Sequence, residues 1–195
     1  MQKRQGFFSI HKPCKMEPVA YPDQHREVVE ALLVDGRFLL EGDAAFMTLK
    51  QGVDFYRDFF RSSFGLELQY HSEYAFLQSG RDTDALSRDV CIFIGVLCYE
   101  LDREGYNLLE QLSFHTLEFE QVEQFFELSS FREVLEATSN LQDAPSRRNF
   151  YNRLHRRRII EKLDEQTFRF TPAHKYFLDF ARQVARYQHH LQEEE

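Results

Sequence analysis

The sequence predicts a mainly α-helical protein with small β-hairpins, an α+β fold, and three observations lead to this prediction. First, apolar residues recur at helical spacing through most of the chain. Second, two segments, 66–79 and 159–170, alternate apolar and polar residues around a short polar turn, as β-hairpins do. Third, each hairpin follows a series of helices, which is the order of elements in a winged helix-turn-helix. We therefore expect two tandem winged-helix domains.

The first winged-helix domain is expected at residues 23–80, after a flexible N-terminal lead at 1–22 that is rich in proline and basic residues. Asp23 is a candidate N-cap of the first helix, in which Val28, Ala31 and Leu32 form the apolar stripe. The other expected features are the end of this helix at Asp35 and Gly36, an extended segment at 38–40, helices at 44–50 (capped by Asp43) and 53–63, and strands at 66–71 and 73–79.

The third helix of this domain combines many aromatic residues with balanced charge. Its two arginines and two aspartates make it a poor candidate for reading DNA and a better one for protein contacts. Helical spacing predicts that its core-facing residues are Val53, Tyr56, Phe59, Phe60 and Phe64. The aromatic residues expected to serve a protein interface are Phe55, Phe59 and Phe60.

A polar break at 81–84 is expected to separate the first domain from a second winged-helix domain at 85–171, which a C-terminal helix and tail at 172–195 follow. The helix expected at 85–103 is apolar on most sides at its centre, so it should be buried. Thr116 is a possible N-cap of an acidic helix that reaches Leu128. The remaining helices are expected around 108–112, at 131–139 and from 173 to about 188.

The last element before the second hairpin is a basic helix that starts at Pro145 and Ser146 and ends near Arg158, with Ser146 as the expected N-cap. Residues 164–166 form the turn of the hairpin. In helix-turn-helix modules the later helix is the usual recognition helix. Its apolar face should consist of Phe150, Tyr151 and Leu154, and its opposite side of Arg148, Asn149, Asn152, Arg153 and Arg156.

This helix and the strand after it form a basic island in an acidic chain. The segment from Arg147 to Lys162 holds six arginines and one lysine against Glu161, a local charge of +6, whereas the whole chain has a charge of −8. A phosphate-contacting face is the preferred interpretation, because guanidinium groups bind phosphate well. The alternatives are a solvated helix face and a surface for an acidic partner subunit. The residues expected to contact DNA are Arg147, Arg148, Arg153, Arg156, Arg157 and Arg158.

The sequence contains no motif that indicates an enzyme, and we expect neither a cofactor nor a metal. GxxxxGK[ST], GxGxxG, HExxH and GxSxG are all missing. His174, His189 and His190 are candidate metal ligands, but adjacent tail histidines are more often solvated. The glutamates between 118 and 127 are interpreted as a solvated helix face rather than as a nuclease centre.

The cysteines and the hydropathy pattern indicate a cytoplasmic protein. Cys14, Cys91 and Cys98 form no CxxC pair, so free thiols in a reducing compartment are expected. The N-terminus has no apolar core like that of a signal peptide, and no apolar run approaches the roughly 20 residues that a membrane span needs.

Two stretches of the chain carry a family resemblance. They are ALLVDGRFLLEGDAAFMTLKQGVDFYRDFFRSSFGLELQYHSEYAFLQS at 31–79 and RRNFYNRLHRRRIIEKLDEQTFRFTP at 147–172. Both resemble MukE-like proteins, including the MksE branch, which are accessory subunits of bacterial SMC-type condensins. Carried over position by position, the basic motif of the family covers Arg153, Arg156 and Arg157, whereas His155 and a β-branched pair stand where the family often has a glycine-containing turn.

The resemblance implies a non-enzymatic subunit with tandem winged-helix domains. Such subunits form homodimers, bind a kleisin of the MukF or MksF type, and through it join an SMC-like ATPase of the MukB or MksB type. The complex is associated with the nucleoid and organises or segregates chromosomal DNA, or acts against plasmids, and DNA is reached through the complex.

Two other functions are alternatives to a condensin subunit. A stand-alone winged-helix transcription regulator would also present a basic helix, but it would need high operator affinity unaided, and the acidic body of the chain argues mildly against that. A nuclease would need convergent carboxylates and would cleave DNA in the presence of a metal.

Overall fold

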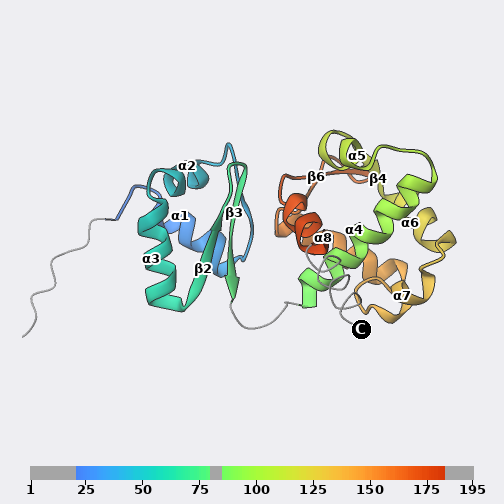
Figure 1. Ribbon diagram of the computed structural model, residues 1–195, viewed down its shortest axis with the longest axis horizontal. Coiled ribbons are helices and arrows are strands. Elements are labelled where there is room, and N and C mark those ends of the chain that lie inside the picture. Colours follow the sequence, from blue (N-terminus) through green and yellow to red (C-terminus); the bar gives the residue numbers. More distant parts are fainter. Residues whose placement is uncertain (1–20, 80–84, 183–195) are drawn as a thin grey trace, which may run out of the picture.

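The computed structural model describes residues 21–79 and 85–182 of the chain. It has the mainly α-helical fold with small hairpins that the sequence predicts, with two three-stranded antiparallel sheets. Figure 1 shows two units next to each other along the long axis, which we name the N-terminal unit (21–79) and the C-terminal unit (85–182). Nearly all of the predicted lead at 1–22 and the whole predicted break at 81–84 lie outside the described residues.

The N-terminal unit follows the predicted order of helices and strands. Its first helix, α1 (His25–Val29), continues into a π-helical turn, η1 (Glu30–Val34). Asp35 and Gly36 end it, and Gly36 has a φ of 56°, a left-handed conformation that glycine adopts without strain. The elements that follow are β1 (Leu39–Leu40), α2 (Ala44–Gln51), α3 (Val53–Phe64), β2 (Leu66–Tyr70) and β3 (Tyr74–Ser79).

The sheet of the N-terminal unit, with strand order β1-β3-β2, contributes to two cores. Successive side chains of a strand point to opposite faces of the sheet. Leu39 and Ala75 accordingly pack with Tyr56 and Phe60 in the core of the N-terminal unit. The side chains on the opposite face belong instead to the core of the C-terminal unit: Phe38, Leu40, Tyr74 and Phe76.

The C-terminal unit contains the same order of elements with extra short helices. Its strands pair in the order β4-β6-β5. In the hairpin turn, Oδ1 of Asp164 accepts hydrogen bonds from the backbone N–H groups of Gln166 (2.8 Å) and Thr167 (2.7 Å), which lower the pKa of this carboxyl. The elements are α4 (Ala85–Arg103), α5 (Leu108–Phe114), β4 (Leu117–Glu118), α6 (Phe119–Leu128), α7 (Arg132–Ala137), α8 (Ala144–Arg156), β5 (Ile160–Lys162) and β6 (Thr167–Phe170), and residues 174–182 are helical.

Helix α4 is the centre of the C-terminal unit, as its apolar sequence predicts. Phe93 is fully buried, and the rings of Phe126 (α6) and Phe150 (α8) each lie edge-on to it, with ring centroids 5.6 Å apart. Edge-to-face aromatic pairs at this distance are favourable beyond the area that they bury. The many phenylalanines of the chain are thus used to join helices around α4.

Several details of the first unit differ from the prediction. Gln24, not Asp23, is the residue before α1, and it has a φ of 62°. Asp43 is the N-cap residue of α2 as predicted, but its Oδ2 accepts a hydrogen bond from the backbone N–H of Leu40 (2.9 Å) instead of one from the helix. Phe64 was expected in the core and is 47% exposed, because it is the last residue of α3.

The acidic helix of the second unit also begins elsewhere than predicted. Thr116 is not its N-cap: α6 starts at Phe119 and Glu118 precedes it. The sequence prediction missed β4, whose two residues pair with β6 in the register Leu117↔Phe168 and Glu118↔Thr167. A strand of two residues is too short to show an alternating pattern.

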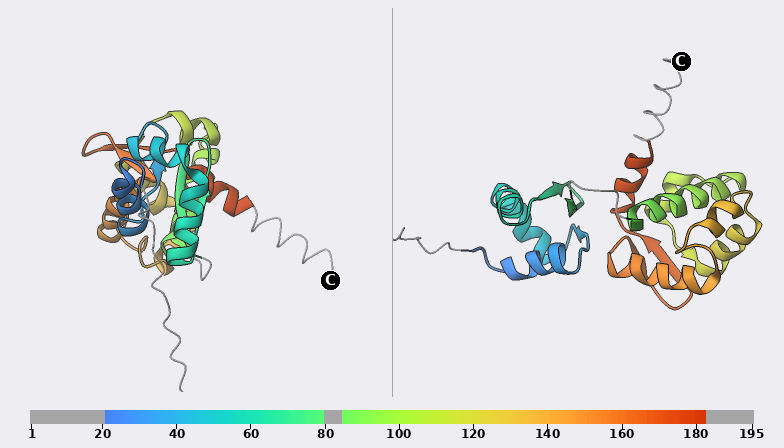
Figure 2. Two further views of the ribbon diagram at one scale, coloured as in Figure 1. Left: turned by 90° about the vertical axis from the view of Figure 1, so that its left-hand side faces the viewer. Right: turned by 90° about the horizontal axis from the view of Figure 1, so that it is seen from below.

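The two units meet at the loop before β1, at the end of α8 and at the helix 174–182. The backbone N–H of Phe38 donates a hydrogen bond to the carbonyl oxygen of Arg157 (3.0 Å). Lys175 pairs with Glu73, and the ring of Tyr176 lies 4.5 Å from that of Phe76. In Figure 2 the helix 174–182 (red) lies on the side of the C-terminal unit that faces the N-terminal unit. The basic end of α8 is thereby placed at the junction.

Candidate nucleic-acid interface

The N-cap of helix α8 lies three residues before the predicted cap. Asp143 is its N-cap, and Oδ1 of Asp143 accepts a hydrogen bond from the backbone N–H of Ser146 (2.8 Å), which lowers the pKa of the Asp143 carboxyl. Pro145 therefore lies in the first turn, where its missing N–H costs no helix hydrogen bond. The prediction that Ser146 is the N-cap is wrong. At the other end, Arg158 has a φ of 61° and turns the chain into β5.

The inward face of α8 is the one that the sequence predicts. Phe150, Tyr151 and Leu154 are buried in the core of the C-terminal unit. The hydroxyl of Tyr151 donates a hydrogen bond to Oε1 of Glu123 on α6 (2.8 Å). Burial, together with the charge of Glu123, raises the pKa of Tyr151 well above its usual value, so the hydroxyl stays protonated as a donor. These contacts fix the rotation of α8 about its axis.

Arg147 lies on the buried side of the helix, contrary to the prediction. It is 7% exposed, its Nη2 lies 2.6 Å from Oε2 of Glu123, and its Nη1 donates a hydrogen bond to the carbonyl oxygen of Leu141 (3.0 Å). Because these partners occupy the guanidinium and the core covers it, Arg147 has no surface to offer to DNA. Arg147 is therefore not among the residues that can contact DNA in this structure.

Arg148 and Arg156 are the exposed arginines of the outward face. Within residues 85–182 and the described part of the N-terminal unit, neither makes a hydrogen bond or an ion pair. Lys162 on β5 lies close by, and its Nζ donates a hydrogen bond to Oδ1 of Asn152 (2.6 Å). The outward face therefore presents two guanidinium groups whose donors are all available to a ligand.

Arg153 is held by a chain of hydrogen bonds that ends in the core. Its Nη1 donates to Oδ1 of Asn140 (2.9 Å), and Nδ2 of Asn140 donates to Oδ2 of Asp89 on α4 (2.6 Å). Asp89 is fully buried, and its Oδ1 lies 2.9 Å from Nη2 of Arg88. The half-buried Arg153 side chain is thus tied to the centre of the unit while part of its guanidinium remains free.

Arg157 and Arg158 reach the N-terminal unit. Nη1 of Arg157 donates a hydrogen bond to the carbonyl oxygen of Gly36 (2.5 Å), and Nη2 of Arg158 lies 3.2 Å from Oδ1 of Asp43. Both side chains are half-buried. Arg158 is therefore already paired with a carboxylate, whereas Arg157 is bonded only to a neutral carbonyl and keeps its charge uncompensated.

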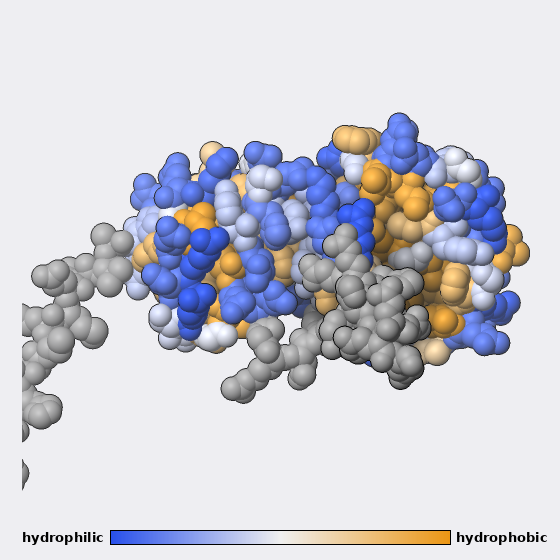
Figure 3. Space-filling view, in the orientation of Figure 1, coloured by the Kyte–Doolittle hydropathy of each residue, from blue (hydrophilic) through white to orange (hydrophobic). Residues whose placement is uncertain are grey.

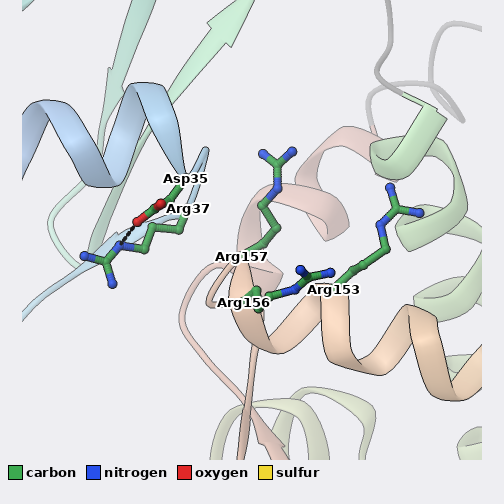
Figure 4. Close-up of a pocket in the computed structure, with 5 residues that line it drawn as sticks. All are labelled: Asp35, Arg37, Arg153, Arg156 and Arg157. Atoms are coloured by element: carbon green, nitrogen blue, oxygen red, sulfur yellow. Dashed lines mark ion pairs between the residues drawn. The ribbon is translucent and has the colours of Figure 1, made fainter.

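The end of α8 borders a cleft between the two units. The cleft has a volume of about 500 Å³ and is lined by Asp35, Arg37, Arg153, Arg156 and Arg157. Figure 4 shows the Arg153 and Arg157 side chains rising from the end of α8, and the Asp35–Arg37 ion pair on the facing loop. All five lining residues are charged, and four of them are positive. The sequence prediction did not include Arg37, because a single arginine beside Asp35 creates no local excess of charge.

The aromatic residues of α3 divide between the core and the surface. Phe60 is fully buried and so does not serve an interface, contrary to the prediction. Phe55 and Phe59 are half-buried, and both rings contact Tyr21 and His25. Burial of His25 in this cluster lowers the pKa of its imidazole. Phe55 and Phe59 thus lie in an aromatic surface cluster made by the start of the N-terminal unit and α3.

The structure assigns structural roles to other candidate groups. Burial raises the pKa of Cys91 and of Cys98 to about 11, so both thiols are protonated near neutral pH. His174 is buried, with Nδ1 2.7 Å from the carbonyl oxygen of Thr171. Cys14, His189 and His190 lie outside the described residues. Among residues 21–79 and 85–182, no group of histidine, cysteine or carboxylate side chains is arranged to hold a metal ion.

No helix in the described part of the chain is long and apolar enough to span a membrane. In a comparison with known protein families, the family model of the condensin complex protein MksE matches residues 23–182. The match includes both units and the whole of α8. No curated protein matches the chain.

Proposed function

This chain belongs to the family of the condensin complex protein MksE, and on that premise we propose that it is a non-enzymatic subunit of a bacterial condensin of the MukBEF or MksBEF type. In this proposal the chain dimerises and binds a kleisin of the MukF or MksF type. Through the kleisin it joins an SMC-like ATPase of the MukB or MksB type. The complex organises or segregates chromosomal DNA, or acts against plasmids, in the nucleoid.

The observation that carries the proposal is the extent of the family match. It runs from residue 23 to residue 182 and so covers nearly all described residues of both units. A transcription regulator that shared only a winged-helix module would be expected to match over one module. The continuous match therefore favours a condensin subunit over a stand-alone regulator.

Helix α8 is the part of the chain that we propose contacts DNA. Arg148 and Arg156 are exposed and without protein partners among the described residues, and Arg153 and Arg157 add charge at the C-terminal end of the helix. Contacts of arginine with phosphate position a protein on DNA without reading its sequence. Because the chain as a whole has a charge of −8, we expect weak binding by the isolated subunit and stronger binding in the complex.

Apolar surface on both units supports the proposed protein partners. The N-terminal unit offers Phe55 and Phe59 next to Tyr21, and Figure 3 shows apolar side chains gathered on the visible face of the C-terminal unit. Exposed apolar side chains that gather in one patch are typical of interaction surfaces. The most exposed ones near α6 and α7 are Tyr99, Leu128, Phe131 and Val134.

A pull-down from native extract with the tagged chain tests the proposal. We expect a kleisin and a large coiled-coil ATPase to be captured together, and to be recovered in lower amounts with a chain in which Phe55 and Phe59 are both replaced by Ser. A matched control replaces Phe114, which is 85% exposed and lies on α5, away from this cluster. Recovery of the chain alone, or with only a specific promoter fragment, would contradict the condensin proposal and favour the transcription regulator.

A further inference from the structure

The cleft between the two units concentrates positive charge that the protein does not neutralise. Its lining holds four arginines and one aspartate, a net charge of +3. Arg37 lies 3.5 Å from Asp35, so these two charges largely compensate each other. Arg153 and Arg157 are bonded only to the neutral oxygens of Asn140 and Gly36. Three arginines at the end of α8 therefore line the cleft without a carboxylate partner, an arrangement that an anion would stabilise.

The chemistry of the cleft selects phosphate as the anion. Each guanidinium carries five N–H donors in a planar fork, which matches the oxygens of a phosphate group. The hydrogen bonds to Asn140 and Gly36 use one nitrogen of each of two arginines, so most of these donors remain free. A volume of about 500 Å³ accommodates a phosphate group with its neighbouring sugars.

The lining also indicates which kind of phosphate compound fits. A nucleotide is usually held by stacking of its base on an aromatic or apolar side chain. The cleft lining contains only charged residues and no such surface. A phosphate of a nucleic-acid backbone, whose bases stay paired in the duplex, needs no base pocket. A DNA backbone phosphate is therefore favoured over a free nucleoside triphosphate.

We propose that the cleft between the two units is a binding site for a backbone phosphate of DNA, formed by Arg153, Arg156 and Arg157. The Asp35–Arg37 pair lies on the opposite wall of the cleft and sets the affinity for this phosphate. The inference rests on the proposed contact between α8 and DNA. It adds that the contact lies at the junction, so that the N-terminal unit takes part in it. Asp35 opposes the phosphate, and Arg37 neutralises Asp35.

Substitutions of Asp35 and of Arg37 should change the affinity for DNA in opposite directions, which provides a specific test. Replacing Asp35 with Asn removes the opposing charge, so it should strengthen binding of a fluorescein-labelled DNA duplex about two- to fivefold. Arg37→Ala leaves Asp35 uncompensated and should weaken binding about three- to tenfold. Binding is measured by fluorescence anisotropy with the 195-residue chain at about 50 mM and about 150 mM salt, because phosphate contacts are weakened by salt.

Matched controls come from α3 of the same unit. Asp54 and Arg57 form a similar exposed pair, with Nη1 of Arg57 3.2 Å from Oδ1 of Asp54. Asp54→Asn and Arg57→Ala change the net charge by the same amount away from the cleft, so they should leave DNA binding within about twofold of the original chain. Circular dichroism and thermal melting verify that each variant folds. Arg37→Gln, which keeps a polar side chain, serves if Arg37→Ala is unstable.

The outcomes separate this inference from the proposed function. If Arg156→Ala weakens DNA binding while the Asp35 and Arg37 variants behave like their α3 controls, α8 contacts DNA outside the cleft and the inference is wrong. If the original chain binds no DNA even at low salt, both the inference and the proposed DNA contact fail. If ATP displaces the duplex at concentrations at which inorganic tripolyphosphate does not, the cleft holds a free nucleotide, which contradicts a backbone site.

Discussion

The guanidinium group of Arg147 lies 2.6 Å from the carboxylate of Glu123, and this ion pair joins α8 to α6 under the surface of the C-terminal unit. The same carboxylate also accepts the hydroxyl hydrogen bond of Tyr151. Glu123 thus receives two donors from successive turns of α8. The helix that we propose for DNA contact is therefore positioned by one arginine and offers others to the ligand.

Substitution of Arg147 should destabilise the protein, whereas substitution of its neighbour Arg148 should leave stability nearly unchanged. Arg147→Ala leaves the Glu123 carboxylate partly buried without its ion partner, so we expect the free energy of unfolding to fall by about 2–4 kcal/mol. Arg148→Ala removes an exposed side chain and should change stability by less than about 0.5 kcal/mol. Urea denaturation measures both effects.

DNA binding by the same two variants provides the complementary readout. At a temperature where both are folded, Arg148→Ala should weaken binding of a DNA duplex, whereas Arg147→Ala should not. If the two substitutions reduce unfolding free energy equally, the burial of Arg147 is not what distinguishes them. Equal loss of DNA binding would place both guanidinium groups on the DNA surface.

The sequence contains the information that places Arg147 on the buried face of α8. Residues 147, 150, 151 and 154 follow the spacing of one helix face, so Arg147 falls on the side of Phe150, Tyr151 and Leu154. The prediction nevertheless included Arg147 among the residues expected to contact DNA. Helix spacing alone would have placed it inward, although only the structure identifies Glu123 as the partner that makes this burial favourable.

Other elements were predictable to different degrees for physical reasons. Helix α4 has the predicted bounds, Ala85 and Arg103, because its long apolar centre defines the pattern on its own. The two hairpins were found through strand alternation. The cleft was not predictable, since Arg37 and Arg157 are far apart in sequence and meet only through the packing of the two units. Local patterns give elements, whereas a site built across a junction needs the tertiary structure.

Substitution of Phe60 should mainly reduce stability, whereas substitution of its neighbours Phe55 and Phe59 should mainly reduce partner binding. Phe60 is fully buried, so Phe60→Ala should lower the free energy of unfolding by about 3–5 kcal/mol through the cavity it leaves. Phe55→Ser and Phe59→Ser affect half-buried rings and should cost less stability. They should instead reduce dimerisation or capture of the kleisin, measured by sedimentation velocity and pull-down. Unchanged assembly in both variants would exclude this cluster as the interface.

His174 should make stability depend on pH just below neutrality. Burial lowers the pKa of its imidazole from the ordinary 6.5, and the nearby Lys175 acts in the same direction, although the hydrogen bond with the Thr171 carbonyl and the charge of Glu73 oppose them. The unfolded chain therefore binds more protons than the folded chain below about pH 6.5. The stabilisation is present above that pH and is lost as the pH falls through the folded pKa.

The measurement is the urea midpoint of the chain at about pH 7.5 and at about pH 5.5. His174→Gln keeps an N–H donor for the Thr171 carbonyl but does not titrate, so its midpoint should fall less between the two pH values. His155→Gln, at an exposed position of α8, is the control and should retain the full pH dependence. An equal drop for all three proteins would assign the effect to other groups, such as His25, whose pKa burial also lowers.

Gly36 should matter for DNA binding because of the side chain that packs on it. Its φ of 56° makes any larger residue strained, and a Cβ at this position would collide with the guanidinium of Arg157. Gly36→Ala should therefore lower the free energy of unfolding by about 1–2 kcal/mol or more and push Arg157 out of the cleft, which weakens binding of a DNA duplex. Gly65→Ala is the matched control, with a φ of 66° and no neighbouring atom within 4 Å of the added Cβ. It should lose similar stability and keep its DNA affinity. Equal affinity of the two variants would show that the position of Arg157 at the junction has no part in binding DNA.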